Sequence, residues 1–256
     1  PRSVDYIKHL CEEFTEIFGD RLFRDDPSII AGFAKIGGVK FMIIAQEKGC
    51  DTESRLKRNF GMPHPEGYRK AMRCMRLAAK FQLPILCLID TPGAQPTLAA
   101  EERGQGWAIA QNLWEMARLP TPMVAILIGE GCSGGAIGIG VTDVVAMLQH
   151  SYYSVISPEA CASILWKDTS KKETAAQALK MHAEDLIELD VIDAIIEEPL
   201  GGAHHDPALT ISNVKKYVLD QWNILKTVPL DILIEQRYQK FRRMGKFQLD
   251  QKPKIL

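Results

Sequence analysis

Four apolar runs recur in the first 151 residues of the chain. Each run is almost continuous in Val, Ile, Leu, Met and Ala, and does not alternate with polar residues. This pattern is typical of strands that are buried on both faces of a parallel sheet. We therefore expect four interior strands. They span residues 40–48, 84–90, 122–130 and 143–151.

Helical periodicity occupies the sequence between and after these runs. Apolar residues recur every three or four positions in three segments, which predicts amphipathic helices, and a fourth, charge-rich segment predicts a closing helix. The alternation of strands with helices is typical of α/β folds. The helices and their apolar faces are 64–81 (Tyr68, Ala71, Met75 and Ala78), 101–119 (Ile109, Leu113 and Met116), 173–189 and 231–244.

Composition and charge narrow the class of protein. A chain of 256 residues with 46% hydrophobic residues can bury a full core without disulfides or a structural metal. The net charge of −1 gives no indication of nucleic acid as a partner, and no apolar run reaches the roughly 18 residues of a membrane span. None of the six cysteines forms a C-x-x-C pair, so no metal site is predicted. We expect reduced thiols in a cytoplasmic protein.

Glycine-rich loops follow two successive strands, at residues 90–97 (DTPGAQPT) and 129–136 (GEGCSGGA). Ligands of α/β sheets bind at the carboxyl ends of the strands, so we expect a site where these loops meet. The second loop is open to three interpretations. As a G-x-G-x-x-G dinucleotide fingerprint it lacks the acidic residue expected about 20 positions later, because Gln149 and His150 stand there.

The second interpretation is a hydrolase elbow. Gly131, Ser133 and Gly135 spell G-x-S-x-G, which would make Ser133 a nucleophile. Such a nucleophile needs a histidine and an acid to orient that histidine. The downstream sequence GGAHHDP (201–207) offers histidines beside an acid, although nothing in the sequence fixes them as partners of the serine. A serine hydrolase therefore stays open as an alternative.

The third interpretation uses the backbone alone. Gly134 and Gly135 let the chain turn sharply into a helix and let a ligand approach their amides. Such amides stabilise negative charge that develops on a carbonyl oxygen, each by roughly 10²–10³ in rate. The first loop, within DTPGA (90–94), is the source expected for a second donor. This interpretation predicts an oxyanion hole.

The two loops and their spacing resemble the crotonase fold. Within that superfamily, motifs along nearly the whole chain resemble the carboxyltransferase alpha subunit of bacterial-type acetyl-CoA carboxylase. The motifs are KRNFGMPHPEGYRKAMR (57–73), IDTPGA (89–94), AEERGQ (100–105), IGEGCSGGA (128–136), YSVISPE (153–159), CASILWK (161–167) and EPLGGAHHDP (198–207).

This resemblance implies a crotonase-like (ClpP/crotonase) α/β fold, a repeated ββα superhelix with C-terminal helices. It implies one carboxyltransferase domain over 1–256, in which 208–256 is a mostly helical extension. The implied reaction moves the carboxyl group of carboxybiotin to acetyl-CoA, giving malonyl-CoA for fatty-acid synthesis. The implied partners are a zinc-containing beta subunit, a biotin carboxyl carrier protein that holds the carboxybiotin, and a biotin carboxylase.

The resemblance also assigns roles to residues. Gly134 and Gly135 would donate their amides to the ureido oxygen of biotin, and Gly93, Ala94, Gly131 and Ser133 would bind substrate. The family's chemistry requires no side-chain base from this chain.

The first loop departs from the family pattern, which reads DTPGAYPG. Gln95 replaces an aromatic residue and Thr97 a glycine, so we expect a changed backbone angle at Thr97. A catalytically weakened scaffold subunit is the second alternative.

Overall fold

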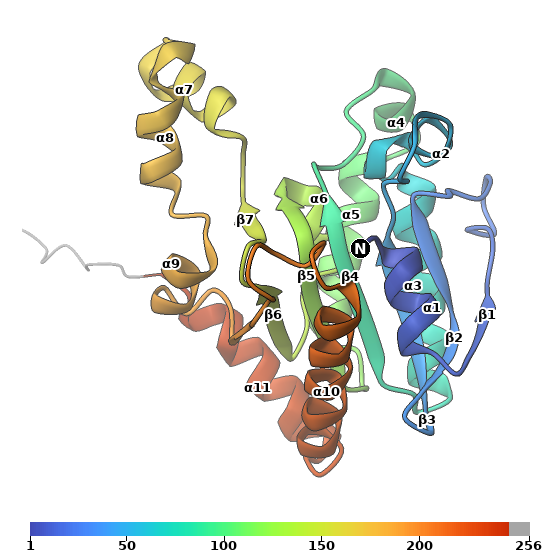
Figure 1. Ribbon diagram of the computed structural model, residues 1–256. Helices are drawn as coiled ribbons and strands as arrows, with labels where there is room; N and C mark the ends of the chain where they lie inside the picture. The colour runs from blue at the N-terminus through green and yellow to red at the C-terminus, as the bar shows by residue number, and fades with distance from the viewer. Residues whose placement is uncertain (246–256) are drawn as a thin grey trace, which may run out of the picture.

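A twisted sheet forms the centre of the structure, a computed structural model that describes residues 1–245 (Figure 1). Its strands are β1 (Glu13–Glu16), β2 (Ile29–Ile36), β3 (Val39–Gln46), β4 (Ile85–Thr91), β5 (Met123–Cys132), β6 (Val144–Leu148), β7 (Tyr152–Ser154) and β8 (Ala194–Ile196). They are ordered β1-β2-β3-β4-β5-β6-β8, and β7 pairs with β5. The β1–β2 and β2–β3 pairs are antiparallel, and every later pair is parallel.

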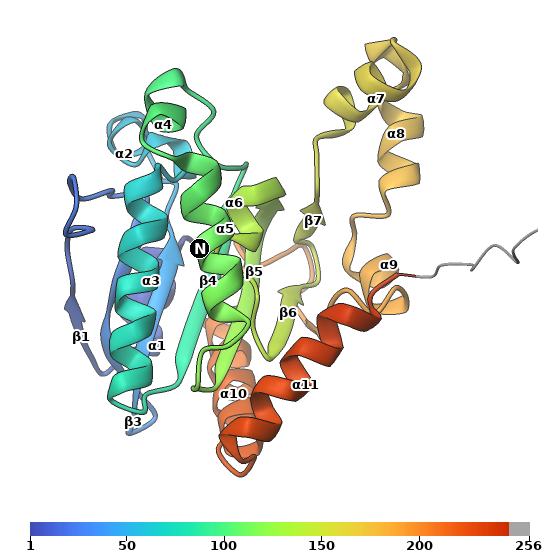
Figure 2. The same cartoon turned by 180° about the vertical axis from the view of Figure 1, so that it is seen from behind.

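Helices cover both faces of this sheet. They are α1 (Ser3–Leu10), α2 (Thr52–Lys57), α3 (Pro65–Lys80), α4 (Leu98–Glu102), α5 (Gln105–Met116), α6 (Ser133–Ile137), α7 (Pro158–Trp166), α8 (Lys172–Leu179), α9 (Ala183–Glu188), α10 (Pro207–Leu225) and α11 (Leu230–Arg243), with short 3-10 turns η1 (Asn59–Gly61) and η2 (Thr169–Lys171). Helices α3 and α5 lie on one face, and α1 and α10 lie on the other (Figures 1 and 2).

The four strands expected from the apolar runs are confirmed as β3, β4, β5 and β6. Strand β4 explains the continuous pattern, because all seven of its residues are buried. Cys87 and Ile89 pack in a core with α3, whereas Leu86 and Leu88 pack in a second core with α1 and α10. Alternate residues of one strand thus fill two hydrophobic layers.

The helix expected over 101–119 is wrong in its boundaries. Its first residues belong to α4, and α5 begins only after Gly104, whose φ of 82° ends the first helix. The buried face of α5 includes Ala108 and Met116, and Ile109 and Leu113 are only half-buried.

The helix expected over 173–189 is also two helices. Lys180 takes a left-handed conformation with φ 47° and ends α8, and His182 then pairs with β7 in an isolated bridge before α9 begins. The α7–α8 hairpin extends away from the sheet (Figure 1). The helix is therefore interrupted where the chain returns from this hairpin and pairs with β7. The apolar periodicity of the sequence does not indicate this interruption.

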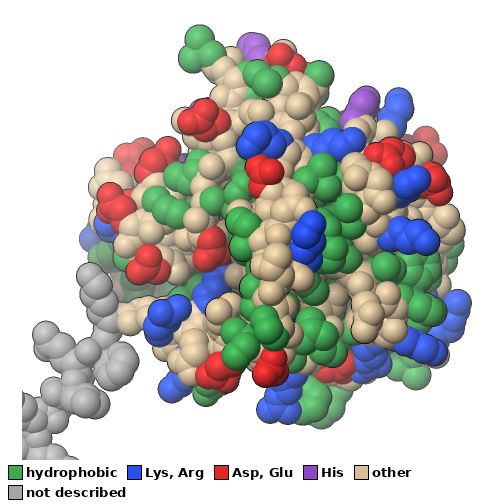
Figure 3. Space-filling model, turned by 90° about the horizontal axis from the view of Figure 1, so that it is seen from below, with side chains coloured by type: hydrophobic (Ala, Val, Ile, Leu, Met, Phe, Trp, Pro, Cys, Tyr) green, Lys and Arg blue, Asp and Glu red, His purple; other side chains and the backbone are tan. Residues whose placement is uncertain are grey.

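The C-terminal segment is helical, as expected, over α10 and α11. The remainder of the expected extension, 246–256, lies outside the described residues. None of the helices within residues 1–245 has both the length and the apolar character needed to cross a membrane. Acidic and basic side chains are interspersed on the face seen from below (Figure 3).

Candidate active site

The last residues of β5 change their neighbour on one side and lead into α6. Residues 130–132 of β5 pair with β7 rather than with β6. The chain then turns sharply at Ser133, whose φ of 54° lies in the left-handed region. Gly129 and Gly131 lie inside β5 and not in the turn, and α6 has only five residues. This geometry contradicts the dinucleotide interpretation, which needs the glycines in the turn before a full helix.

Two backbone amides at the start of α6 have no protein acceptor. The first N–H groups of a helix have no partner within it, and neither the Gly134 nor the Gly135 amide makes a hydrogen bond within residues 1–245. The amide of Ala94, in the loop after β4, is also without an acceptor in the described chain.

The two glycine-rich loops touch through their backbones. A Cβ atom added at Gly135 would lie 2.5 Å from the carbonyl carbon of Gly93 and 2.8 Å from the nitrogen of Ala94. Only a residue without a side chain permits this approach. The absence of a side chain at Gly135 therefore lets the backbones of the two loops lie in direct contact.

A cavity of about 760 Å³ opens beside these amides. Gly93, Ala94, Ser133 and Gly134 line it, whereas Gly131 and Gly135 are buried and do not reach its surface. Further parts of its wall come from the rest of the first loop, from the end of α4 and the start of α5, and from residues 152–159. An adjoining apolar cavity of about 360 Å³ shares Ser133 and Gly134. Four of the six predicted site residues thus line one cavity, and the other two lie behind it.

Charged residues that sequence reasoning missed line a separate hollow of about 310 Å³ near the ends of β4 and β5. Lys48 pairs with both Asp90 and Glu130. Burial opposes ionisation of Glu130, but hydrogen bonds from Lys48 and Tyr152 hold the pKa of its carboxyl below the ordinary value. Burial raises the pKa of the Cys132 thiol, which stays protonated at neutral pH. No local motif marks these residues, because their partners come from separate strands.

The structure does not assemble a hydrolase triad. Ser133 is exposed, and within residues 1–245 no histidine lines either cavity that it borders. The histidine pair 204–205 lies in an exposed segment before α10, and the adjacent Asp206 accepts a hydrogen bond from the Leu209 amide at 2.9 Å as the helix cap. Asp206, the acid that would have to orient the histidine of a triad, therefore caps α10 instead.

The altered first loop is held in place by polar contacts. The side-chain amide of Gln95 donates to Asn59 at 3.0 Å, and Gln105 donates to the carbonyl of Gln95 at 3.0 Å. Thr97 has φ −75°, a conformation open to any residue. A change of this angle relative to the glycine of the family pattern stays a prediction.

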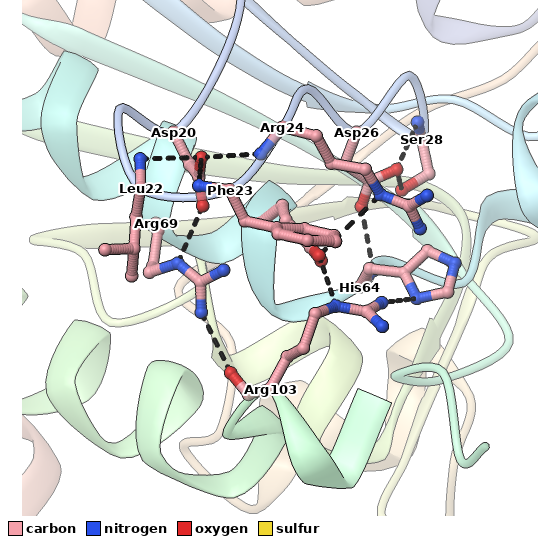
Figure 4. A network of polar contacts seen from close by, with 10 residues as sticks. Asp20, Leu22, Phe23, Arg24, Asp26, Ser28, His64, Arg69 and Arg103 are labelled. Atoms are coloured by element: carbon pink, nitrogen blue, oxygen red, sulfur yellow. Dashed lines mark hydrogen bonds and ion pairs between the residues drawn. The ribbon is translucent and has the colours of Figure 1, made fainter. Parts of the chain in front are cut away.

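A polar network fixes the start of α5, which forms one wall of the cavity (Figure 4). Just before α5, Arg103 pairs with the buried Glu66 of α3 and contacts Nδ1 of His64 at 3.3 Å. Arg69 donates to the Arg103 carbonyl at 3.0 Å and pairs with Asp20. The network joins the loop after β1 to α3 and to the chain preceding α5.

The family of the chain follows from its similarity to known proteins. Residues 1–245 match the family described as acetyl co-enzyme A carboxylase carboxyltransferase-like. The chain belongs to that family. It is 63% identical over 247 residues to the acetyl-coenzyme A carboxylase carboxyl transferase subunit alpha of Protochlamydia amoebophila, a match that covers 96% of this chain and 78% of that protein.

Solved structures share the fold at low sequence identity. The transcarboxylase 12S hexamer with methylmalonyl-coenzyme A bound matches 97% of this chain and 43% of its own, with a TM-score of 0.70 and 14% identity. A chain of a Pseudomonas malonate decarboxylase hetero-tetramer in complex with coenzyme A matches 86% of this chain and 90% of its own, with a TM-score of 0.69 and 15% identity. The predicted crotonase-like α/β fold is confirmed. Within residues 1–245, no three His, Cys, Asp or Glu side chains are grouped to hold a metal ion.

Proposed function

We propose that this chain is the alpha subunit of an acetyl-CoA carboxylase carboxyltransferase, and that it transfers the carboxyl group of carboxybiotin to acetyl-CoA to form malonyl-CoA. Membership of the family supports this activity. The proposed partners are a biotin carboxyl carrier protein, a biotin carboxylase and a zinc-containing beta subunit that binds acetyl-CoA. The chain would thus supply one half of a shared active site.

The observation that carries the proposal is a set of three amides that make no hydrogen bond within residues 1–245: those of Gly134 and Ala94, which line the cavity, and that of Gly135, which is buried next to them. Carboxybiotin, when bound, supplies the carboxyl group from a ring nitrogen of its urea, and negative charge develops on the urea oxygen as that group leaves. Amides that point at such an oxygen stabilise the transition state more than the ground state. These amides carry no net charge, as is appropriate for binding the urea ring of biotin, which is neutral before the carboxyl group leaves.

The remaining residues of the site favour this role over nucleophilic catalysis. The Cys132 thiol is protonated, because burial raises its pKa, and Ser133 has no histidine partner in the described chain. This chain then orients the carboxyl donor and stabilises charge, and does not form a covalent bond to substrate.

Reconstitution with a beta subunit tests the proposal. Malonyl-CoA decarboxylation with free biotin as the acceptor should require both subunits and biotin together. Ser133→Ala should retain turnover, and a fluorophosphonate probe should leave the chain unlabelled. Labelling at Ser133 would instead favour a hydrolase. Partner binding without any turnover would favour the scaffold alternative.

A further inference from the structure

One buried side chain bridges the two loops of the site from beneath. Gln46 is the last residue of β3 and is fully buried. Its Nε2 donates to the Gly135 carbonyl at 2.7 Å, and its Oε1 accepts a hydrogen bond from the Asp90 amide at 3.2 Å. The first bond reaches α6, and the second reaches the end of β4, two residues before the loop that carries Gly93 and Ala94.

Both groups that Gln46 contacts have lost their regular backbone partners. The pairing of β4 with β3 ends at Leu88 and Ala45, so the Asp90 amide, which follows on the β3 side of the strand, lies beyond this ladder. Helix α6 ends before its second turn, since the Ile139 amide bonds to the Ala136 carbonyl and not to that of Gly135. The Tyr68 hydroxyl, at 3.5 Å, is the other donor near the Gly135 carbonyl. A buried polar group without a partner is costly, so Gln46 satisfies two such groups at once.

Gln46 is itself held on the opposite side of the sheet. Its carbonyl accepts a hydrogen bond from the Ser3 hydroxyl at 2.6 Å, and its backbone is in register with Ile29 of β2. The Asp90 carboxylate meanwhile accepts from the Glu130 amide of β5 at 3.0 Å. The bridge therefore connects the active-site loops to a rigid part of the fold.

We propose that Gln46 is a positioning residue for carboxyl transfer, which sets the separation between the Ala94 amide and the amides of Gly134 and Gly135. The inference rests on the proposed function. Donors stabilise a developing oxyanion only when they lie within about 2.7–3.1 Å of it, so loss of the bridge lowers catalysis without removing any donor. Gln46 does not line the cavity and touches no substrate.

Gln46→Glu separates this role from a merely structural one. A protonated glutamic acid has the same shape, with an O–H to donate to Gly135 and a carbonyl to accept from Asp90. The ionised form has no donor and places negative charge against the Gly135 carbonyl. Burial and that carbonyl both favour the neutral form, so the pKa of the new carboxyl should lie well above its usual value of about 4.3.

The test measures biotin-dependent malonyl-CoA decarboxylation by the complete alpha–beta enzyme as a function of pH. We expect kcat of Gln46→Glu, relative to wild type, to fall about 100-fold or more between low and high pH as the carboxyl ionises. Gln46→Met has neither bond and should show a similar loss at every pH. KM for malonyl-CoA should stay within about twofold, because the missing contact does not bind the CoA substrate.

Matched controls keep the outcomes distinct. Gln236→Glu, on the exposed surface of α11, should follow the wild-type pH profile. Melting temperatures and partner binding are measured on the same samples, so that kcat refers to folded complex. If folded Gln46→Met keeps wild-type kcat, or Gln46→Glu shows no pH-dependent loss, the inference is wrong while the proposed function stands. An inactive wild-type complex would instead refute the proposed function, and the inference with it.

Discussion

Two adjacent glycines of α6 differ in the space around them. A Cβ at Gly135 would lie 2.5 Å from the backbone of Gly93, and backbone atoms cannot move aside without shifting the loop. A Cβ at Gly134 would lie 3.3 Å from the end of the Ile109 side chain, which can rotate. Neither glycine has a positive φ, so alanine introduces no backbone strain at either position.

We therefore expect Gly135→Ala to lower kcat by about 100-fold or more, because it separates the two loops and displaces the amide donors. Gly134→Ala should lower kcat by less than about tenfold, since its amide and its neighbours stay in place. Biotin-dependent decarboxylation by the alpha–beta complex measures both effects. Equal losses in the two variants would contradict the assignment of a close contact between the loops.

The break between α4 and α5 lies at the cavity, which Glu101 lines on one side of the break and Gln105 on the other. Gly104 ends the first helix in a left-handed conformation with φ 82°. Gly106 stands two residues later, inside α5, with no positive φ and open space where a Cβ would lie. Glycine is therefore needed at position 104, where it allows the left-handed conformation, and is not needed at position 106, where a side chain would fit.

Alanine substitutions should change stability with opposite signs. Gly104→Ala should lower the free energy of unfolding by about 1–2 kcal/mol, because an L-residue is strained in the left-handed region. Gly106→Ala should raise it by roughly 0.5–1 kcal/mol, because alanine favours a helix interior. Urea denaturation monitored by circular dichroism measures both. A gain in stability from Gly104→Ala would show that the two helices can join.

At the scale of the whole molecule, one arginine joins the C-terminal helix to the sheet. Arg237 of α11 is buried and contacts both carboxylate oxygens of Asp143 at 2.7 and 2.9 Å. It also donates to the carbonyls of Met116, the last residue of α5, and of Leu119 and Thr121, which follow that helix. These contacts connect α11 to segments more than 90 residues earlier in the chain.

Arg237→Ala should lower the free energy of unfolding by about 3–5 kcal/mol, because it leaves a buried carboxylate unpaired. Arg242→Ala, on the exposed surface of the same helix, should change it by less than about 0.5 kcal/mol. Chemical denaturation compares the two. A similar, small effect of both substitutions would mean that α11 contributes little to the stability of the sheet.

The strands and the two loops could be predicted from local sequence because each depends on its own residues. A strand such as β4, buried on both faces, needs an unbroken apolar run. A chain that turns directly from strand to helix beside another backbone needs glycine, as at Gly135. The helix breaks at Gly104 and Lys180 were missed, since the apolar periodicity continues across both positions.

The sequence by itself thus determined four strands of the sheet, β3 to β6, the position of the glycine-rich loops and the family of the chain, whereas β1, β2, β7 and β8 were not predicted. Tertiary structure alone decided which side chains support those loops. Gln46 reaches a carbonyl 89 residues away, and Lys48 pairs with an acid 82 residues away. Hydrogen bonds and ion pairs over such separations depend on how strands are ordered in the sheet, and no local pattern of polar and apolar residues records that order.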